Sequence, residues 1–282
     1  MVILHSLEAL HEWQNSVHWK DRITSFVPTM GALHDGHLSL ITKALEQAEL
    51  VVVSVLVNPT QFNDSSDYDG YPRTLESDAA KAASAGAHAV FAPTAEGLYG
   101  GVPTAPEVRW GALTDTYEGA FRAGHFDGVI RVVDLLFQAV RPNSAVFGAK
   151  DLQQVAVVRR MAQERHPQVA IVVGELVRDA RGLALSSRNV RLDDQGMEQA
   201  LALHEALSSI HAAGQALDAD GCWTEALDQA RKQLGEQVVL EYLDVVDVDT
   251  FEPQRKKGKG AAYAVVAAHV QGVRLIDNMR VA

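Results

Sequence analysis

Two histidines three residues apart, His34 and His37, carry the clearest chemical signal in this sequence. They follow a Pro-Thr-Met-Gly turn and stand at the start of a predicted helix. Side chains at this spacing share one face of a helix, and the free N–H groups at a helix N-terminus favour bound anions. The pattern predicts a site that holds a nucleotide phosphate and stabilises its charge while it is attacked.

The same spacing permits two other interpretations. His-x-x-His can place two zinc ligands on one helix face, but neither a cysteine pair nor a third histidine at ligand-like spacing accompanies it. The chain has 11 histidines, so a single one is more often structural than functional. A phosphate contact is the interpretation that the preceding turn and the following helix favour.

Alternating strands and helices must position these histidines. Short apolar runs that are continuous rather than alternating are typical of strands buried on both faces of a parallel sheet. They occur at residues 23–27, 50–57, 89–92, 145–147 and 169–173. Helices are predicted between them at residues 36–49, 75–85, 125–140 and 152–165. This order predicts an α/β fold with a doubly wound, Rossmann-like parallel sheet and right-handed crossovers.

Such sheets bind their ligands beyond the carboxyl ends of the strands. Four segments rich in glycine, proline and polar residues fall at those ends, at residues 28–31, 58–62, 93 and 148–151. We therefore expect these segments, although far apart in the sequence, to line one crevice.

The sequence pattern changes after about residue 175. Helices are predicted at residues 193–214 and 222–234, and an antiparallel pair of strands at residues 238–248 and 261–270. We therefore divide the chain into a Rossmann-like, nucleotide-binding domain of residues 1–174 and a smaller α+β C-terminal lid domain of residues 175–282. The segment QRKKGKG at residues 254–260 is either a basic phosphate-binding loop or a solvated turn, and we favour the turn.

Composition excludes several classes of function. The net charge of −11 over 282 residues argues against a general nucleic-acid or anionic-membrane binder, since either needs a basic surface. No apolar stretch reaches the roughly 18–20 residues that span a bilayer. The lone Cys222 excludes an intramolecular disulfide and fits a reducing compartment. We expect a cytoplasmic protein without nucleic-acid or membrane partners.

Six motifs occur in order along the chain: PTMGALHDGH, LVNPTQF, YPRTLESD, HFDGV, VFGAKDLQQ and LALSSRN. In this order and at these spacings they closely resemble the pantothenate synthetase family, the pantoate–β-alanine ligases. The resemblance covers essentially the whole chain. His-x-Gly-His alone also marks other nucleotidyltransferases and class I aminoacyl-tRNA synthetases, whereas LVNPTQF and GAKDLQQ with LSSRN are far more specific.

The resemblance implies a two-step reaction. The carboxylate of pantoate attacks the α-phosphate of ATP and forms pantoyl adenylate and pyrophosphate. The amine of β-alanine then attacks the acyl carbon, which releases AMP and pantothenate. The first step requires positioning and neutralisation of the triphosphate charge rather than a covalent enzyme nucleophile. ATP is thus a substrate, Mg²⁺ the implied metal and a homodimer the implied assembly.

The resemblance also assigns the catalytic and nucleotide-binding residues. His37 is the donor to the charge that develops at the α-phosphate, and five other residues share the catalytic role: His34, Lys150, Ser186, Ser187 and Arg188. The implied ATP site comprises Met30, Gly31, Ala32, Leu33, His34, Asp35, Gly36, His37, Gly148, Ala149, Lys150, Asp151, Val177, Leu185, Ser186, Ser187 and Arg188.

The implied sites for the other substrates use amide side chains. Gln61 and Gln154 bind pantoate, whose hydroxyls and carboxylate need both donors and acceptors. Gln61 and Asn58 are placed at β-alanine. Asp78, in the first turns of a predicted helix, is the best candidate ligand for Mg²⁺, a hard cation that prefers carboxylate and phosphate oxygens.

Several positions depart from the usual pattern of the family. Ala149 stands where glutamate is common, Leu152 where an aromatic residue is common, and Ser77 where an acidic residue often precedes Asp78. In the predicted helix at residues 125–140, Asp127, Arg131 and Leu135 also differ from the usual family residues. Ala123, just before that helix, differs as well. None of these changes removes an implied catalytic residue, but they could alter nucleotide affinity or a subunit interface.

Two other functions stay open on these residues. One is a different adenylyl-transfer enzyme that acts on another acid or phosphate ester; it would have no reason to retain Gln61 and Gln154 within their motifs. The other is a relative that binds ATP without turnover, which the departures around residues 127–152 make plausible.

Overall fold

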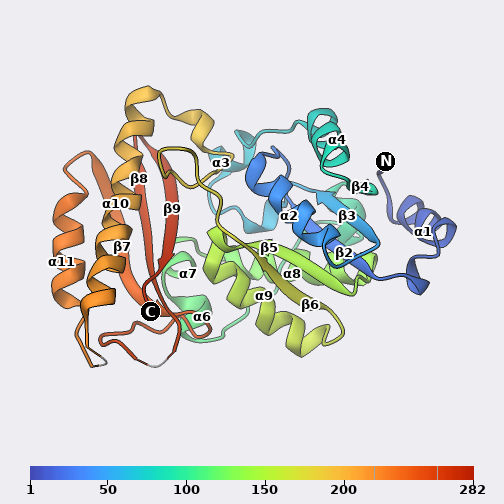
Figure 1. The fold of residues 1–282 in the computed structure, drawn as a ribbon. Helices are drawn as coiled ribbons and strands as arrows, with labels where there is room; N and C mark the ends of the chain where they lie inside the picture. The colour runs from blue at the N-terminus through green and yellow to red at the C-terminus, as the bar shows by residue number, and fades with distance from the viewer. Residues whose placement is uncertain (219, 259) are drawn as a thin grey trace.

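The computed structural model describes residues 1–218, 220–258 and 260–282, which form two β-sheets with flanking helices (Figure 1). The larger sheet has six parallel strands in the order β1-β4-β3-β2-β5-β6. These are β1 (Val2–Leu4), β2 (Thr24–Thr29), β3 (Leu50–Val55), β4 (Ala89–Phe91), β5 (Ser144–Gly148) and β6 (Ala170–Gly174). The predicted α/β class with a parallel sheet is confirmed.

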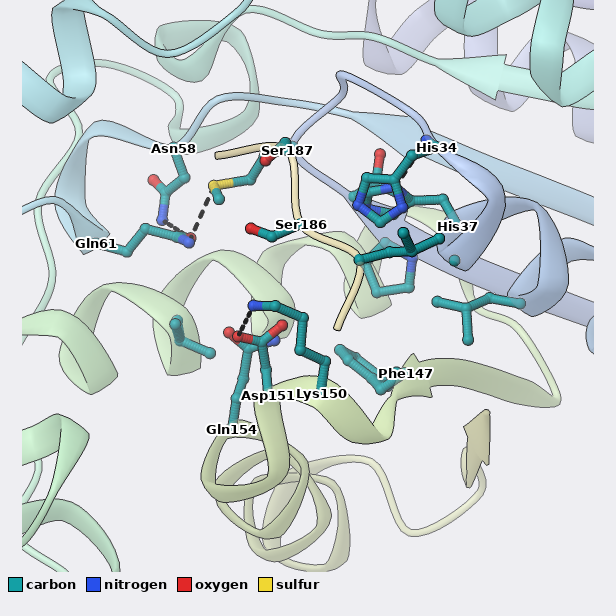
Figure 2. Close-up of a pocket in the computed structure, with 18 of the residues that line it drawn as sticks. His34, His37, Asn58, Gln61, Phe147, Lys150, Asp151, Gln154, Ser186 and Ser187 are labelled. Atoms are coloured by element: carbon teal, nitrogen blue, oxygen red, sulfur yellow. Dashed lines mark hydrogen bonds and ion pairs between the residues drawn. The ribbon is translucent and has the colours of Figure 1, made fainter. Parts of the chain in front are cut away.

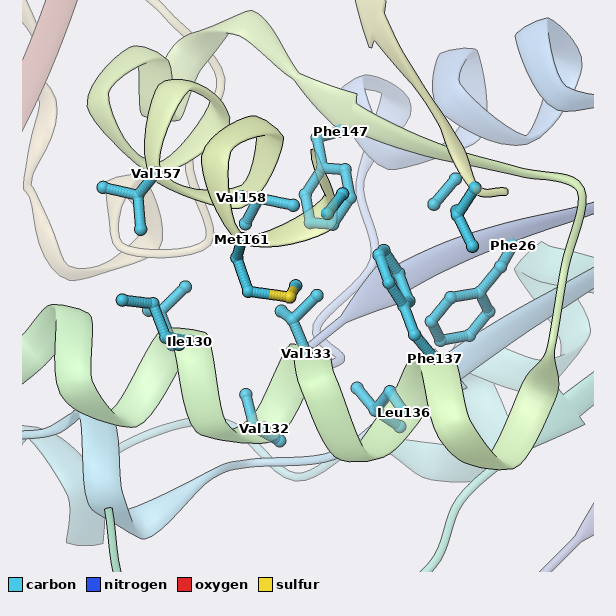
Figure 3. Close-up of a cluster of buried hydrophobic side chains, with 14 of the residues drawn as sticks. Phe26, Ile130, Val132, Val133, Leu136, Phe137, Phe147, Val157, Val158 and Met161 are labelled. Carbon is cyan, nitrogen blue, oxygen red and sulfur yellow. The ribbon is translucent and has the colours of Figure 1, made fainter. Parts of the chain in front are cut away.

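Helices cover both faces of this sheet because its central strands are apolar on both faces. Helices α2 (Asp35–Leu45) and α4 (Leu75–Ser84) cover one face, where Val27 is buried. The other face carries α1 (Leu7–Ser16), α8 (His125–Val140) and α9 (Leu152–Arg165). There Phe26 packs edge-on against Phe137 of α8, with ring centroids 6.4 Å apart (Figure 3).

Short helical segments join these elements. They are η1 (Trp19–Asp21), η2 (Pro59–Gln61), α3 (Ser65–Asp69), α5 (Ala95–Tyr99), α6 (Ala112–Asp115), α7 (Glu118–Phe121), η3 (Ala149–Asp151) and η4 (Asn189–Arg191). Two of them, η2 and η3, lie directly beyond the carboxyl ends of β3 and β5. They therefore bring the NPTQ and AKD segments to the predicted binding edge.

The order of the strands reverses beside β2. From β2 the chain continues to β3 and β4 on one side, and it later returns to the other side as β5 and β6. A ligand crevice is expected at such a reversal, outside the carboxyl ends of the strands. Residues 28–31 cover the end of β2 and the turn after it, and residues 148–151 cover the end of β5 and η3, so the two segments flank this point.

The smaller sheet has three antiparallel strands rather than the predicted pair. They are β7 (Val238–Asp247), β8 (Ala262–Val270) and β9 (Val273–Arg280). Helices α10 (Asp194–Ala216) and α11 (Thr224–Gln233) pack on one face around the buried Trp223. Its other face contributes Val246 and Val265 to the core beneath α8 and α9. The proposed boundary at residue 174 stays a prediction.

The basic segment at residues 254–260 has a structural contact that fits a turn. The Lys257 Nζ donates hydrogen bonds to the carbonyls of Gly214 and Leu217, at 2.8 and 3.0 Å, where α10 ends. Lys259 lies outside the described residues. Within the described parts of the chain, helices are too short or too polar to cross a membrane.

Candidate active site

A cavity of about 1290 Å³, counted with its part open to solvent, lies at the carboxyl ends of β2 and β5 (Figure 2). It brings together most of the predicted site residues, from segments throughout the chain. They are Met30, His34, Gly36, His37, Asn58, Gln61, Gly148, Lys150, Asp151, Gln154, Val177, Leu185, Ser186, Ser187 and Arg188. Six predicted residues are not among those that line it, namely Gly31, Ala32, Leu33, Asp35, Ala149 and Asp78.

Asp78 holds the turn that precedes α2. Its Oδ2 accepts a hydrogen bond from Ala32 N–H at 3.0 Å, and its Oδ1 accepts one from Leu33 N–H at 2.7 Å. Thr74 donates a third, and the side chain is fully buried. The turn needs this support because Gly31 and Ala32 both have positive φ angles, 88° and 51°. The carboxylate faces the turn, not the cavity, which corrects our expectation of a magnesium ligand.

His37 presents a defined nitrogen to the cavity. Its Nδ1 accepts a hydrogen bond from the backbone N–H of His34 at 3.3 Å, so the proton of the neutral ring lies on Nε2. Burial, together with the nearby His34, Lys150 and Lys81, lowers the pKa of His37 to about 3. His37 is therefore a neutral hydrogen-bond donor at physiological pH.

His34 packs against His37, with ring centroids 4.1 Å apart. Burial and the nearby charge of Lys150 lower the pKa of His34 to about 4. Its Nδ1 is buried and has no hydrogen-bond partner in the described parts of the chain. The two rings and the N-terminus of α2 thus form a neutral, donor-rich surface beside Lys150.

We expect three histidines with lowered pKa values to make the protein lose stability at pH values above the range in which carboxylates titrate. The pKa values of His34, His37 and His125 are lowered to about 4, 3 and 3, against about 6.5 in the unfolded chain. Between these values the unfolded chain binds more protons, so stability is complete above pH 6.5 and falls as the pH falls. Each such histidine adds a slope of up to about 1.4 kcal/mol per pH unit.

Urea unfolding at a series of pH values measures this slope directly. The His125→Gln variant, which removes one titrating ring, is expected to lose stability less steeply between pH 6 and pH 4. An identical slope in the variant and the wild type would contradict the assignment.

Gln61 is held at the cavity by Asn58. The Asn58 Nδ2 donates to Gln61 Oε1 at 3.0 Å and to the Gly128 carbonyl at 3.2 Å. Its Oδ1 accepts from Thr60 and Tyr99, and the residue is 1% exposed. Since both ends of the Asn58 amide are already bonded, the structure gives it the role of orienting Gln61 in place of the expected contact with β-alanine.

Lys150 and Gln154 face Gln61 across the cavity. Lys150 lies on η3, and its Nζ is 3.8 Å from Asp151 Oδ1. Strand β9 fixes this turn, because Asn278 Nδ2 donates to the carbonyls of Ala149 and Lys150 at 2.8 and 3.0 Å. Gln154, in the first turn of α9, is half-buried at the cavity wall.

The segment of residues 175–191 forms the remaining wall. Arg178 anchors it to β9 through two hydrogen bonds to Asp277, at 2.6 and 2.9 Å. The Ser187 hydroxyl lies 3.2 Å from the Tyr71 hydroxyl. Arg188 pairs with Asp67 of α3 at 2.7 Å, and Arg191 pairs with the same carboxylate at 3.0 Å. Two hydroxyls and a guanidinium from this segment thus line the cavity.

Among the cavity residues without a predicted role, four have ionisable side chains: Tyr71, Arg122, His125 and Glu175. Tyr71 and His125 stand within the motifs YPRTLESD and HFDGV, so these motifs were the available signal. Arg122 and Glu175 lie outside the six motifs. Their place in the wall depends on packing that no local pattern reveals.

The departures from the family pattern lie mostly outside the cavity. Asp127 accepts a hydrogen bond from Val108 N–H at 2.9 Å, and Arg131 lies over the Tyr99 ring, 6.0 Å from its centroid. Ala149 is not among the cavity residues, and Leu152 is buried. Ser77 is exposed on α4. These changes leave the cavity wall around His37, Lys150 and Arg188 intact.

The described residues contain no group of three or more histidine, cysteine, aspartate or glutamate side chains that could hold a metal ion. The pair His34 and His37 therefore has no third protein ligand in the described parts of the chain, and zinc has no geometric support. With Asp78 committed to the turn, the donor set does not form a protein cage for magnesium either.

Comparison with known proteins decides the family. The model of the pantoate–β-alanine ligase family matches residues 2–280. This chain belongs to that family. A pantothenate synthetase from Acidothermus cellulolyticus is 46% identical over 261 residues, which are 90% of this chain and 84% of that ligase.

Solved structures of the ligase family agree with this assignment. The pantothenate synthetase of Thermus thermophilus superposes with a TM-score of 0.90 at 39% identity, over 100% of this chain and 99% of that one. A ligase from Francisella tularensis, complexed with beta-gamma ATP and β-alanine, has a TM-score of 0.81 at 32% identity. That match covers 99% of this chain and 97% of the other. The predicted family is confirmed.

Proposed function

We propose that this protein joins pantoate to β-alanine in an ATP-dependent reaction that forms an amide bond. The observation that carries the proposal is a single cavity with two chemically distinct walls. Neutral donors and cations (His37, Lys150, Arg188) suit a triphosphate, while the amides of Gln61 and Gln154 suit a hydroxy acid. Membership of the ligase family supplies the reaction.

In the first step a carboxylate oxygen of pantoate attacks the α-phosphorus of ATP. A new P–O bond forms, the bond to the β-phosphate oxygen breaks, and pyrophosphate leaves with the electron pair. The Nε2–H of His37 donates to a non-bridging α-phosphate oxygen, where negative charge grows. Lys150 and Arg188 neutralise the leaving pyrophosphate. Both effects stabilise charge with groups already oriented by the fold.

In the second step the uncharged amine of β-alanine attacks the acyl carbon of pantoyl adenylate. The C–N bond forms, the C–O bond to AMP breaks, and the amine nitrogen loses a proton. AMP is a far better leaving group than an oxide ion, which is why the acid must first be adenylated. Gln61, between the two substrates in this proposal, contacts both pantoate and β-alanine.

The apolar part of pantoate has a matching surface. Helix α8 contributes Val129, Val132, Val133 and Leu136 to the cavity wall. Pantoate carries two methyl groups on the carbon next to its hydroxymethyl group, and these need contact with apolar side chains. We place them against α8, with the hydroxyls and the carboxylate directed to Gln61 and Gln154.

Replacing Gln154 with alanine is expected to raise the KM for pantoate by about tenfold to a hundredfold. The reason is that an unmade hydrogen bond to a buried substrate group costs about 1–3 kcal/mol. The KM for ATP should change by less than twofold. Initial-rate kinetics with each substrate varied in turn measure the two constants. The control is Gln163→Ala, an exposed glutamine on the same helix. Equal increases in both constants would contradict the assignment.

Pantoate-dependent exchange of labelled pyrophosphate into ATP, measured without β-alanine, tests the whole proposal. Exchange is expected, because adenylation is reversible and precedes the arrival of the amine. Exchange supported only by a different acid would indicate another adenylyl-transfer enzyme. ATP binding without any exchange would indicate a non-catalytic relative.

Magnesium, the subunit number and the location rest on the family resemblance. We propose that Mg²⁺ enters on the triphosphate and is held mainly by phosphate oxygens and water, which is its common mode in nucleotide sites. The half-exposed carboxylate of Asp151 is the cavity residue best suited to contact it. A homodimer, which light scattering tests, and a cytoplasmic location stay predictions.

A further inference from the structure

We propose that the first turn of α8, through His125 and Gly128 of the HFDGV motif, fixes the position of Gln61 and thereby the affinity for pantoate. His125 acts here as a positioning residue that does not itself touch the substrate. The inference deepens the proposed function and rests on it, since it takes Gln61 as a pantoate contact.

Helix α8 approaches the Gln61 turn tightly at Gly128. A Cβ atom on Gly128 would lie 2.3 Å from the Thr60 carbonyl oxygen and 2.6 Å from the Gln61 backbone nitrogen. Both distances are far inside van der Waals contact, and the obstructing atoms are backbone. Asn58 closes the contact by donating to the Gly128 carbonyl at 3.2 Å. Only glycine lets η2 sit this close to the helix.

His125 bonds the backbone of Gln61 directly. Its Nδ1 is 2.9 Å from the Gln61 carbonyl oxygen, and a carbonyl can only accept, so Nδ1 carries the proton. The Nε2 of the neutral ring then accepts from Arg122 at 3.0 Å. Burial and the charge of Arg122 lower the pKa of His125 to about 3, so the ring is neutral at physiological pH.

A chain of charged groups continues from His125 to the smaller sheet. Arg122 also donates to Glu118 at 3.3 Å. Glu118 accepts two hydrogen bonds from Arg274 of β9, at 2.8 and 2.6 Å, and one from Tyr242 of β7 at 2.7 Å. Burial alone would raise the pKa of Glu118, but Arg274, Arg122 and Tyr242 lower it to about 2. Arg122, which bonds His125, is thus anchored to β9 through Glu118 and Arg274.

The side chain of Gln61 depends on this backbone. Its Oε1 accepts from Asn58, and its Nε2 lies 3.1 Å from the sulfur of Met30, a weak acceptor. One N–H and one lone pair stay directed by the turn and are the groups we assign to pantoate. A displacement of the turn by about 1 Å misplaces them, and errors of that size cost about a hundredfold in enzymes.

The variants His125→Asn and His125→Gln separate the two nitrogens of the ring. The amide of asparagine reaches the position of Nδ1 and can still donate to the Gln61 carbonyl, whereas that of glutamine reaches the position of Nε2. We expect the KM for pantoate to rise at least tenfold in H125Q and to stay within threefold in H125N. In both variants the dissociation constant of ATP, measured by calorimetry, should stay within twofold.

The matched control is His166→Gln, which changes another buried histidine outside the cavity, bonded to Asp134. It should leave the KM for pantoate unchanged. Unchanged pantoate KM in H125Q, or equal losses for ATP and pantoate in it, would overturn the proposal, because the second result marks a general structural effect.

Crystal structures of H125Q and Gly128→Ala decide the positional claim independently of catalysis. We expect residues 58–61 to move away from α8 in both, and an unmoved turn would overturn the inference. If the wild type shows no pantoate-dependent exchange, the proposed function fails, yet these structures still test the position of Gln61. If the wild type does show exchange while the turn and the KM are unchanged in the variants, the inference alone fails.

Discussion

Replacing His37 with alanine is expected to lower the rate of adenylation by two to three orders of magnitude without unfolding the protein. Removal of one preorganised donor to a developing anion costs about 10²–10³ in rate. His37 fits this role because its Nδ1 is occupied by the His34 N–H, which leaves Nε2–H for the cavity. The low pKa of about 3 also means that no proton must be lost before it donates a neutral hydrogen bond.

Two further substitutions locate the nitrogen that matters. In His37→Gln the side-chain amide reaches the position of Nε2, so this variant should retain more activity than His37→Asn. Pyrophosphate exchange at saturating ATP and pantoate measures the adenylation step, and urea unfolding confirms the fold. A near-normal exchange rate in H37A would remove the residue from catalysis. Greater activity in H37N than in H37Q would place the donor on Nδ1 and contradict the tautomer.

Replacing Asp78 with asparagine is expected to cost about 3 kcal/mol of stability and most of the activity, because a buried donor left without an acceptor costs about 1–3 kcal/mol. The carboxylate accepts from Ala32 N–H and Leu33 N–H on separate oxygens, and an amide can accept at only one of them. The other backbone N–H then faces an NH₂ group. The positive φ angles of Gly31 and Ala32 lose their support, so the turn before His34 relaxes.

Added magnesium separates this role from that of a metal ligand. If Asp78 bound Mg²⁺, raising the MgCl₂ concentration would restore activity to D78N, and the unfolding midpoint would change little. We expect the reverse, a lower midpoint in urea and no recovery with magnesium. Glu76→Gln, an exposed change in the same helix, serves as the control and should affect neither measurement.

The parallel sheet and the histidine turn could be predicted because their signals are local. Continuous apolar runs mark β2 and β3, and His34 and His37 stand at the N-terminus of α2, as expected. The strand β9 was missed even though Gln271 and Gly272, both with positive φ, form the tight turn before it. Its place in the site depends on contacts across great separations, such as Asn278 with Ala149, 129 positions away.

The direction of a polar side chain was the least predictable feature. Asp78 and Asn58 both belong to motifs that contribute residues to the cavity. The polar atoms of each side chain are nevertheless bonded to nearby protein groups. Asp277 looks like an ordinary strand residue but holds Arg178 through two hydrogen bonds. The type and spacing of residues indicate which chemistry is available. The packed backbone decides which group each polar side chain bonds.

The ion pair between Arg188 and Asp67 sets a competition at the triphosphate end of the cavity. In the proposed function, a phosphate that takes the Nε and Nη2 donors of Arg188 displaces a carboxylate of the same chain, which then acts as a tethered competitor at a fixed effective concentration. The observed dissociation constant of ATP is then the intrinsic constant divided by the fraction of molecules in which this pair is open. Asp67 also pairs with Arg191, so displacing its carboxylate frees two guanidinium groups at once. The affinity for the nucleotide then depends more strongly on the charge of its phosphates than a single arginine contact would make it.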